Sequence, residues 1–113
     1  MGIFHDVHCL EDFGMIAGSY RTIHIDCTDT KGDPIRLSTM IAFGCKFFWY
    51  GTNDVAFEIE GVPNALLPYR MEIRIPSALT EGLADCCLEY MPYVTSAEQT
   101  IKYGKGRIMI EGG

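Results

Sequence analysis

Histidine and cysteine side chains close to the start of the chain are the first candidates for chemistry. His5, His8 and Cys9 follow one another as H-x-x-H-C, and zinc accepts both imidazole and thiolate ligands. This spacing matches no established zinc motif, because no second ligand pair follows at the expected distance. A polar segment with one buried cysteine is the simpler interpretation, so we expect neither a metal nor another cofactor.

Cys86 and Cys87 form a second candidate pair because they are adjacent in the sequence. Neighbouring side chains of a strand point to opposite faces, so these two thiols cannot bind one metal or form a disulfide without strain. We interpret them as two independent strand positions.

Three carboxylates, Asp26, Asp29 and Asp33, surround a turn and have the residue type that calcium prefers. An EF-hand loop requires glycine at its sixth position, where this chain has Lys31. We therefore expect aspartate side chains that bond to their own turn, without a metal.

Motifs that signal catalysis are absent from the sequence. It contains no G-x-S-x-G, no H-E-x-x-H, no P-loop and no dinucleotide fingerprint. Glu58, Glu60 and Glu72 alternate with apolar residues on expected strands, which favours a solvated sheet face over an acid–base pair. We expect that the protein is not an enzyme.

Composition points to one globular domain. The chain has 113 residues, of which 48% are hydrophobic and 21% charged. Its net charge of -6 disfavours nucleic acid and anionic lipid as partners, and no apolar run has the length of a membrane span. Five cysteines cannot all pair within one chain, so we expect free thiols that act as small core side chains in a reducing cytosol.

From residue 19 onward, apolar side chains alternate with polar ones, which is typical of half-buried strands. Strands of this length with a turn after each predict an all-β sandwich or barrel, together with one helical turn. The expected strands are 20–27, 40–50, 55–60, 71–75, 84–94, 97–103 and 107–110, with a short extended piece at 35–37. The expected turns and loops are 28–34, 51–54, 61–68 and 104–106, and the helical turn is 77–83.

Residues 1–18 have a different pattern, in which apolar side chains recur at three- and four-residue steps. This allows a short amphipathic helix, although Gly14 and Gly18 disfavour a long one. An extended arm that docks on a neighbouring molecule is equally consistent with the sequence. We therefore divide the chain into an N-terminal arm, 1–18, and a β-sandwich domain, 19–113.

An aromatic run, Phe47-Phe48-Trp49-Tyr50, makes both faces of one expected strand apolar. A sandwich strand needs only one apolar face, so Phe48 and Tyr50 are expected to point outward. Exposed aromatic side chains are enriched at protein interfaces, although cover by the N-terminal segment or a loop is an equal alternative. The candidate interface residues are Phe4, Phe13, Phe48, Tyr50, Tyr90 and Tyr93.

The order of turns and strands from residue 14 to the end resembles the small immunoglobulin-like domains of tailed-phage virion proteins, such as the N-terminal domain of baseplate upper proteins. Three segments carry the resemblance: a D-x-x-G-x-P-x-x-L-S turn at 29–38, an L-T-x-x-L turn at 79–83, and a closing strand at 106–110 that is similar to G-x-I-x-V. The chain departs from that family at Asp85-Cys86-Cys87, where the family has an entry similar to Gly-Lys-Tyr.

This resemblance implies an immunoglobulin-like antiparallel sandwich of about seven strands. It implies a structural subunit of a phage particle, in the baseplate, tail, neck or capsid surface, that assembles in the host cytoplasm. The implied partners are other virion proteins or further copies of the chain, with no nucleic acid and no membrane.

Two rival functions remain at this stage. A ligand-binding β-barrel would line its pocket with Trp49, Tyr69 and Tyr90 and would gain thermal stability from a specific ligand. A small metalloprotein or enzyme would use His5, His8, His24 and cysteines, and its purified form would contain stoichiometric metal.

Overall fold

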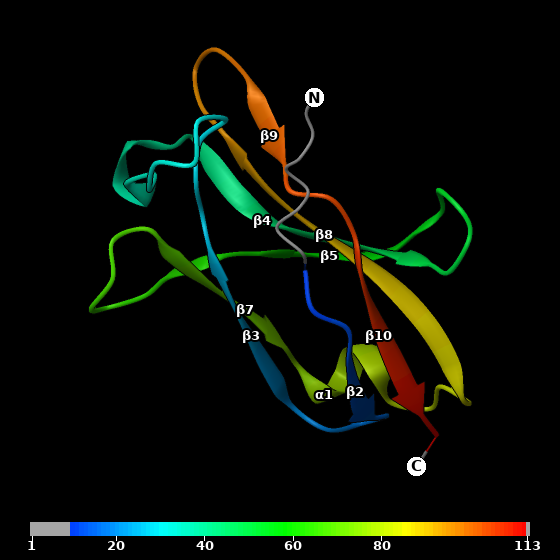
Figure 1. Cartoon of the computed structure of the whole chain (residues 1–113). Helices are drawn as coiled ribbons and strands as arrows, with labels where there is room; N and C mark the ends of the chain where they lie inside the picture. The colour runs from blue at the N-terminus through cyan, green and yellow to red at the C-terminus, as the bar shows by residue number, and fades with distance from the viewer. Residues whose placement is uncertain (1–9, 113) are drawn as a thin grey trace.

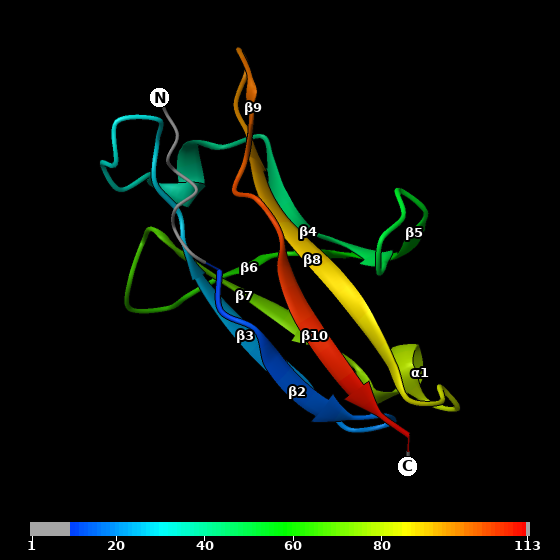
Figure 2. The same cartoon turned by 45° about the vertical axis from the view of Figure 1, so that its right-hand side comes forward.

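The computed structural model describes residues 10–112, which fold as two β-sheets packed face to face (Figures 1 and 2). The larger sheet has the strand order β2 (Phe13–Ile16), β10 (Gly106–Glu111), β8 (Cys86–Thr95), β4 (Ala42–Trp49) and β5 (Val55–Glu60), and β9 (Thr100–Lys102) also pairs with β8. The smaller sheet has the order β3 (Arg21–Asp26), β7 (Arg70–Ile75) and β6 (Val62–Pro63). The predicted all-β, sandwich-like architecture is therefore confirmed.

The core lies between the sheets and is built from side chains at alternate strand positions. In the larger sheet, Phe47, Leu88 and Ile108 are at most 1% exposed, and in the smaller sheet Met71 and Ile73 are fully buried. Burying each such side chain contributes about 1.5–3 kcal/mol to folding. The inward positions of β8 and β7 are thus the ones that the sequence alternation predicted. In β4 the alternation places Cys45 and Phe47 correctly, but it also predicts Trp49 on the core face, and Trp49 is 40% exposed.

The N-terminal part of the described chain is a strand. Residues 13–16 form β2, which runs parallel to β10 with Phe13 opposite Ile108. The amphipathic helix is therefore not formed in residues 10–18, and the sheet is not antiparallel throughout. Pairing with β10 satisfies the backbone of β2 and buries Met15, whereas a helix there would have to accommodate Gly14 and Gly18.

A single helical turn, α1 (Ser77–Thr80), connects β7 to β8, as the sequence predicted. Pro76 takes the N-cap position, and no side chain caps the turn. The hydroxyl of Thr80 instead accepts a hydrogen bond of 2.9 Å from the N–H of Gly18. This bond holds the β2–β3 connection against α1. Within residues 10–112, every helical segment is too short or too polar to cross a membrane.

The four cysteines of residues 10–112 differ in how deeply they are buried. Cys27 and Cys45 are fully buried thiols, and burial raises the pKa of Cys27 to about 12 and also raises that of Cys45. Cys86 and Cys87 are half-buried and are not bonded to another cysteine. The prediction of small core thiols thus holds for Cys27 and Cys45, while Cys9 lies outside the described residues.

We expect Gly106→Ala to destabilise the fold because this glycine makes room for the ring of Tyr90. A Cβ at position 106 would lie 2.5 Å from Tyr90 Cζ and 2.7 Å from its hydroxyl, which no packed structure tolerates. Overpacking of this kind costs about 1–3 kcal/mol, measurable as a lower urea midpoint. Gly14→Ala is the matched control in the same sheet, because its Cβ would be 3.5 Å from the nearest atom. Equal midpoints for the two variants would contradict this account.

Candidate docking surfaces

The outer face of the six-stranded sheet, turned away from the core, carries a group of exposed apolar side chains. They are Ile16 (55% exposed), Met109 (46%), Tyr50 (54%) and Val55 (50%). We call these four residues the apolar row. They come from both ends of the sheet and from its centre, so only the folded sheet brings them onto one surface.

Strand register places the members of the apolar row next to one another. Met109 of β10 is directly opposite Cys87 of β8, and the N–H of Tyr50, just after β4, donates to the carbonyl of Cys87 over 3.3 Å. Ile16 of β2 pairs with Glu111, two residues along β10 from Met109. Directly opposed side chains lie about 4.5–5.5 Å apart at Cβ. Val55 of β5 lies opposite Phe48, two residues before Tyr50. The row therefore crosses β2, β10 and β8, passes the end of β4 and reaches β5.

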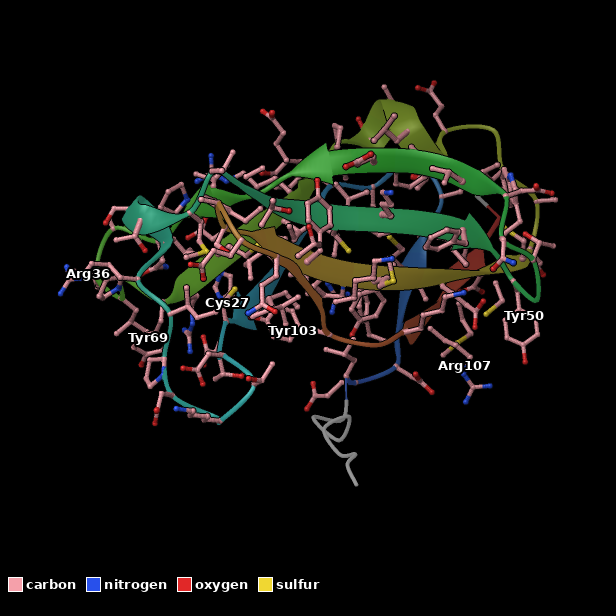
Figure 3. All side chains as sticks on the ribbon, turned by 90° about the horizontal axis from the view of Figure 1, so that it is seen from above. Cys27, Arg36, Tyr50, Tyr69, Tyr103 and Arg107 are labelled. Atoms are coloured by element: carbon pink, nitrogen blue, oxygen red, sulfur yellow. The ribbon has the colours of Figure 1, made fainter. Side chains whose placement is uncertain are left out.

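Arg107 borders the apolar row and links it to the start of β2. Its guanidinium binds Asp12 through Nε (3.2 Å) and Nη2 (2.8 Å), and its backbone N–H donates to the same carboxylate over 3.0 Å. These hydrogen bonds hold the pKa of Asp12 below its ordinary value. Figure 3 shows Tyr50 and Arg107 side by side at one end of the molecule, far from Tyr69 and Arg36.

Phe48 is on the outward side of β4 but does not form an exposed aromatic surface, so this expectation was wrong. Its side chain is 7% exposed. The ammonium of Lys105 lies 4.5 Å from the ring centroid, and it also approaches Glu89 at 3.7 Å. The alternative that a loop covers the aromatic run is thus correct for Phe48, because the loop before β10 supplies Lys105.

The other predicted interface residues are distributed over both sides of the large sheet. Tyr90 is 2% exposed and belongs to the core, where its hydroxyl donates to the carbonyl of Glu11. Phe13 packs against Tyr90 with ring centroids 5.5 Å apart, so neither is a surface anchor. Tyr93 is half-buried on the outer face and donates to Glu58. Tyr50 is the one predicted residue with a well-exposed ring among those described, and Phe4 lies outside them.

Sequence reasoning missed Ile16, Met109 and Val55. Met109 is an outward strand position with a large apolar side chain, where a solvated strand would have a polar residue, so the sequence contains a signal for it. Alternation places Val55 with Phe57 and Ile59, which pack against the core, and only the register shift that brings Val55 opposite Phe48 changes its position.

The predicted aspartate turn is confirmed for Asp29. The carboxylate of Asp29 accepts from the backbone N–H groups of Lys31 (2.8 Å) and Asp33 (2.9 Å), which lowers its pKa. Asp26 instead binds Arg70 at 2.6 Å. In the part of the chain that the structure describes, no three side chains of the metal-binding types come together. His5, His8 and Cys9 are not among those residues.

The glutamates that alternate on the strands have separate partners. Glu58 accepts from Tyr93 on the larger sheet, while Glu72 of the smaller sheet binds Arg74 at 2.8 Å and Asn64 at 3.0 Å. Arg74 lowers the pKa of Glu72. The structure thus gives these two carboxylates different roles in surface hydrogen bonding.

A groove of about 560 Å³ runs along β3 between the two sheets. Its lining includes Tyr90 and Tyr103, but neither Trp49 nor Tyr69 contributes to it. The three residues of the expected ligand pocket therefore do not share this groove, and the sheets are stacked instead of closed into a barrel.

Comparison with known proteins adds no relative: neither a protein-family model nor a curated protein matches this chain.

We expect the contribution of Asp12 to stability to depend on pH. Because the pKa of Asp12 is lower in the folded chain than its ordinary value of 3.8, the tie to Arg107 stabilises the fold above that value and is lost as pH falls through the folded pKa. Asp12→Asn should therefore lower the melting temperature at pH 6, and the difference should shrink as the pH falls below 3.8 and through the lower pKa of the folded chain. A difference that is constant with pH would show that the charge of Asp12 is not responsible.

Proposed function

We propose that this chain is a non-enzymatic structural subunit of a phage particle, an immunoglobulin-like domain that acts by docking onto other virion proteins. The phage assignment is based on the three sequence segments that resemble virion domains. The docking role is based on the apolar row of the large sheet.

The strand arrangement supports the immunoglobulin-like part of the proposal. In such sandwiches the second, fifth and fourth strands, B, E and D, form one sheet, while G, F, C and the additional C′ form the other. Taking β3 as the second strand, the order β3–β7–β6 matches B–E–D, and β10–β8–β4–β5 matches G–F–C–C′. The hairpin partner β9 and the parallel strand β2 are additions to that scheme.

Two features of antibody domains differ in this chain. The B and F strands of those domains are joined by a disulfide against a buried tryptophan on strand C. Here the four described cysteines are free, and Trp49 at the end of β4 is 40% exposed while Phe47 fills the core. The proposal is therefore a sandwich stabilised by apolar packing, as expected for a protein that folds in a reducing compartment.

The exposed apolar row is the observation that carries the docking role. Large apolar side chains that cluster on one face, bordered by charged groups such as Arg107 and Glu111, are typical of protein interaction sites. Partner recognition would centre on Tyr50, because tyrosine is enriched among the side chains that dominate binding energy. A small interface is sufficient in a particle in which many copies bind at once, because the separate contacts act together.

A double variant, Tyr50→Ser with Met109→Ser, tests the docking role. If the row mediates contact between copies, sedimentation velocity should show concentration-dependent oligomers that this variant weakens on the order of tenfold or more. The matched control is Ile41→Ser with Leu66→Ser, which removes two exposed apolar side chains (69% and 88%) outside the row. Equal weakening by both pairs would mean that the effect is general surface hydrophobicity.

Gene neighbourhood tests the phage assignment independently. Flanking genes for capsid, portal or tail proteins would support it, and tagged protein should then sediment with the assembled particles. If the neighbouring genes encode none of these, or the protein stays out of the particles, the assignment is wrong.

A further inference from the structure

The outward side chains of β10 change in charge along the strand. Arg107, Met109 and Glu111 occupy successive outward positions, and all three are exposed. Successive outward side chains of one strand are about 7 Å apart, so the cation and the carboxylate are separated by roughly 14 Å with Met109 midway between them. The outer face of β10 therefore has a positive end, an apolar middle and a negative end.

Uncharged residues continue the middle of this pattern onto the neighbouring strands. Met109 pairs with Gly14 of β2 on one side and with Cys87 of β8 on the other. Beyond Cys87, the same line reaches Tyr50, whose N–H donates to the carbonyl of Cys87. A line that crosses the sheet at right angles to the strands, through Met109, thus meets four residues without a charge.

The negative end of β10 borders a shallow hollow of about 640 Å³. Ile16 and Met109 line it together with two carboxylates, Glu111 and Asp85. Asp85 is held beside the end of β10 because its carboxylate accepts from the N–H of Gly112 at 2.6 Å. Among the described residues that line this hollow there is no lysine or arginine, so it offers a negative potential to a cation.

The positive end of β10 can donate to a second molecule. Asp12 accepts from Nε and Nη2 of Arg107, so Nη1 can donate to another carboxylate. The side chain of Arg107 is 52% exposed. Glu89, which pairs with Arg107 across the strands, has the ammonium of Lys105 at 3.7 Å. The carboxylates on this side of the row therefore already have cations of their own.

We propose that the apolar row binds the same row of a second copy of the chain, about a twofold axis that crosses β10 at Met109. This axis runs along the uncharged line and reverses β10 against itself. Each Met109 then meets its own counterpart, and Arg107 of each copy meets Glu111 of the other. The inference rests on the docking role proposed above and names a second copy as the partner of that surface.

The charge pattern favours a second copy over an unrelated partner, because it complements itself. A side chain on a twofold axis faces an identical side chain, so a charge there would be repelled. Gly14, Met109, Cys87 and Tyr50 avoid this repulsion. Away from the axis, each copy presents a cation where the other presents the acidic hollow, and the contact forms two identical ion pairs.

The size of the surface determines how strong the contact is. The apolar row spans five neighbouring strands about 4.8 Å apart, which makes it roughly 20 Å wide. This is below the width of a standard interface of about 800 Å² on each partner. We therefore expect a weak dimer, whose population rises with protein concentration.

Sedimentation velocity of the full 113-residue chain tests the proposal by exchange of charges. Glu111→Arg brings two arginines together at each ion pair, so it should weaken self-association by at least on the order of tenfold. Arg107→Glu should weaken it as well, because two glutamates then meet. An equimolar mixture of the two variants should restore the dimer, since each variant then supplies the charge that the other lacks.

Glu98→Arg is the matched control, because it makes the same change of charge at an exposed position of the β8–β9 turn. It should leave self-association unchanged. Circular dichroism checks that each variant is folded, which matters for Arg107→Glu because it loses the tie to Asp12. The proposal is overturned if Glu111→Arg and Glu98→Arg have equal effects, or if the mixture of folded variants stays monomeric.

Disulfide trapping provides a test that does not depend on Arg107→Glu. A cysteine on the twofold axis meets its own counterpart, so Met109→Cys with Cys87→Ser should form a covalent dimer under mild oxidation. The second substitution removes the thiol that lies opposite position 109 in the same chain. Lys102→Cys with Cys87→Ser places the new thiol at an exposed position away from the axis and should remain monomeric. Equal trapping of both variants, or of neither, would reject the axis.

Binding to assembled particles separates a failure of this inference from a failure of the docking role. Suppose that the chain stays monomeric at high concentration but sediments with the particles, and that Tyr50→Ser with Met109→Ser abolishes this binding. A second copy is then not the partner, while the docking role of the row stands. A chain that neither self-associates nor sediments with the particles rejects both.

Discussion

The unequal size of the two sheets is the constraint on which the other features depend. Burying the inward side chains of β4, β8 and β10 requires a second layer, and β7 supplies Met71, Ile73 and Ile75 for it. Three strands cannot cover six, so part of the larger sheet has no strand of the smaller sheet opposite it. The groove along β3 lies at this part of the sandwich, and Phe13, Tyr90 and Tyr103 line it.

The apolar row and the groove along β3 occupy different parts of the sandwich. The apolar row uses side chains on a paired sheet, so a partner would meet it face to face. The groove lies along β3 between the two sheets, and polar and apolar side chains line it together.

Individual positions show where local pattern was insufficient. Period-two alternation correctly placed Leu88 and Phe47 in the core, because alternation depends only on the strand itself. The sequence predicts an exposed Phe48, and this is wrong because Lys105, which covers its ring, is 57 residues away in sequence. Tyr90 is a core residue and not the predicted surface anchor, because its partner Phe13 belongs to a strand whose pairing with β10 no local pattern reveals.

By itself, the sequence determined the β class, most strand positions, the aspartate turn and the free core thiols, because neighbouring residues decide each of these. Tertiary structure decided which outward residues gather into the apolar row and which strand edge lines a groove. It also decided that residues 13–16 join the sheet instead of forming a helix. The physical reason is that cross-strand pairing and sheet stacking join residues far apart in the chain, and their energy is not visible in any local window.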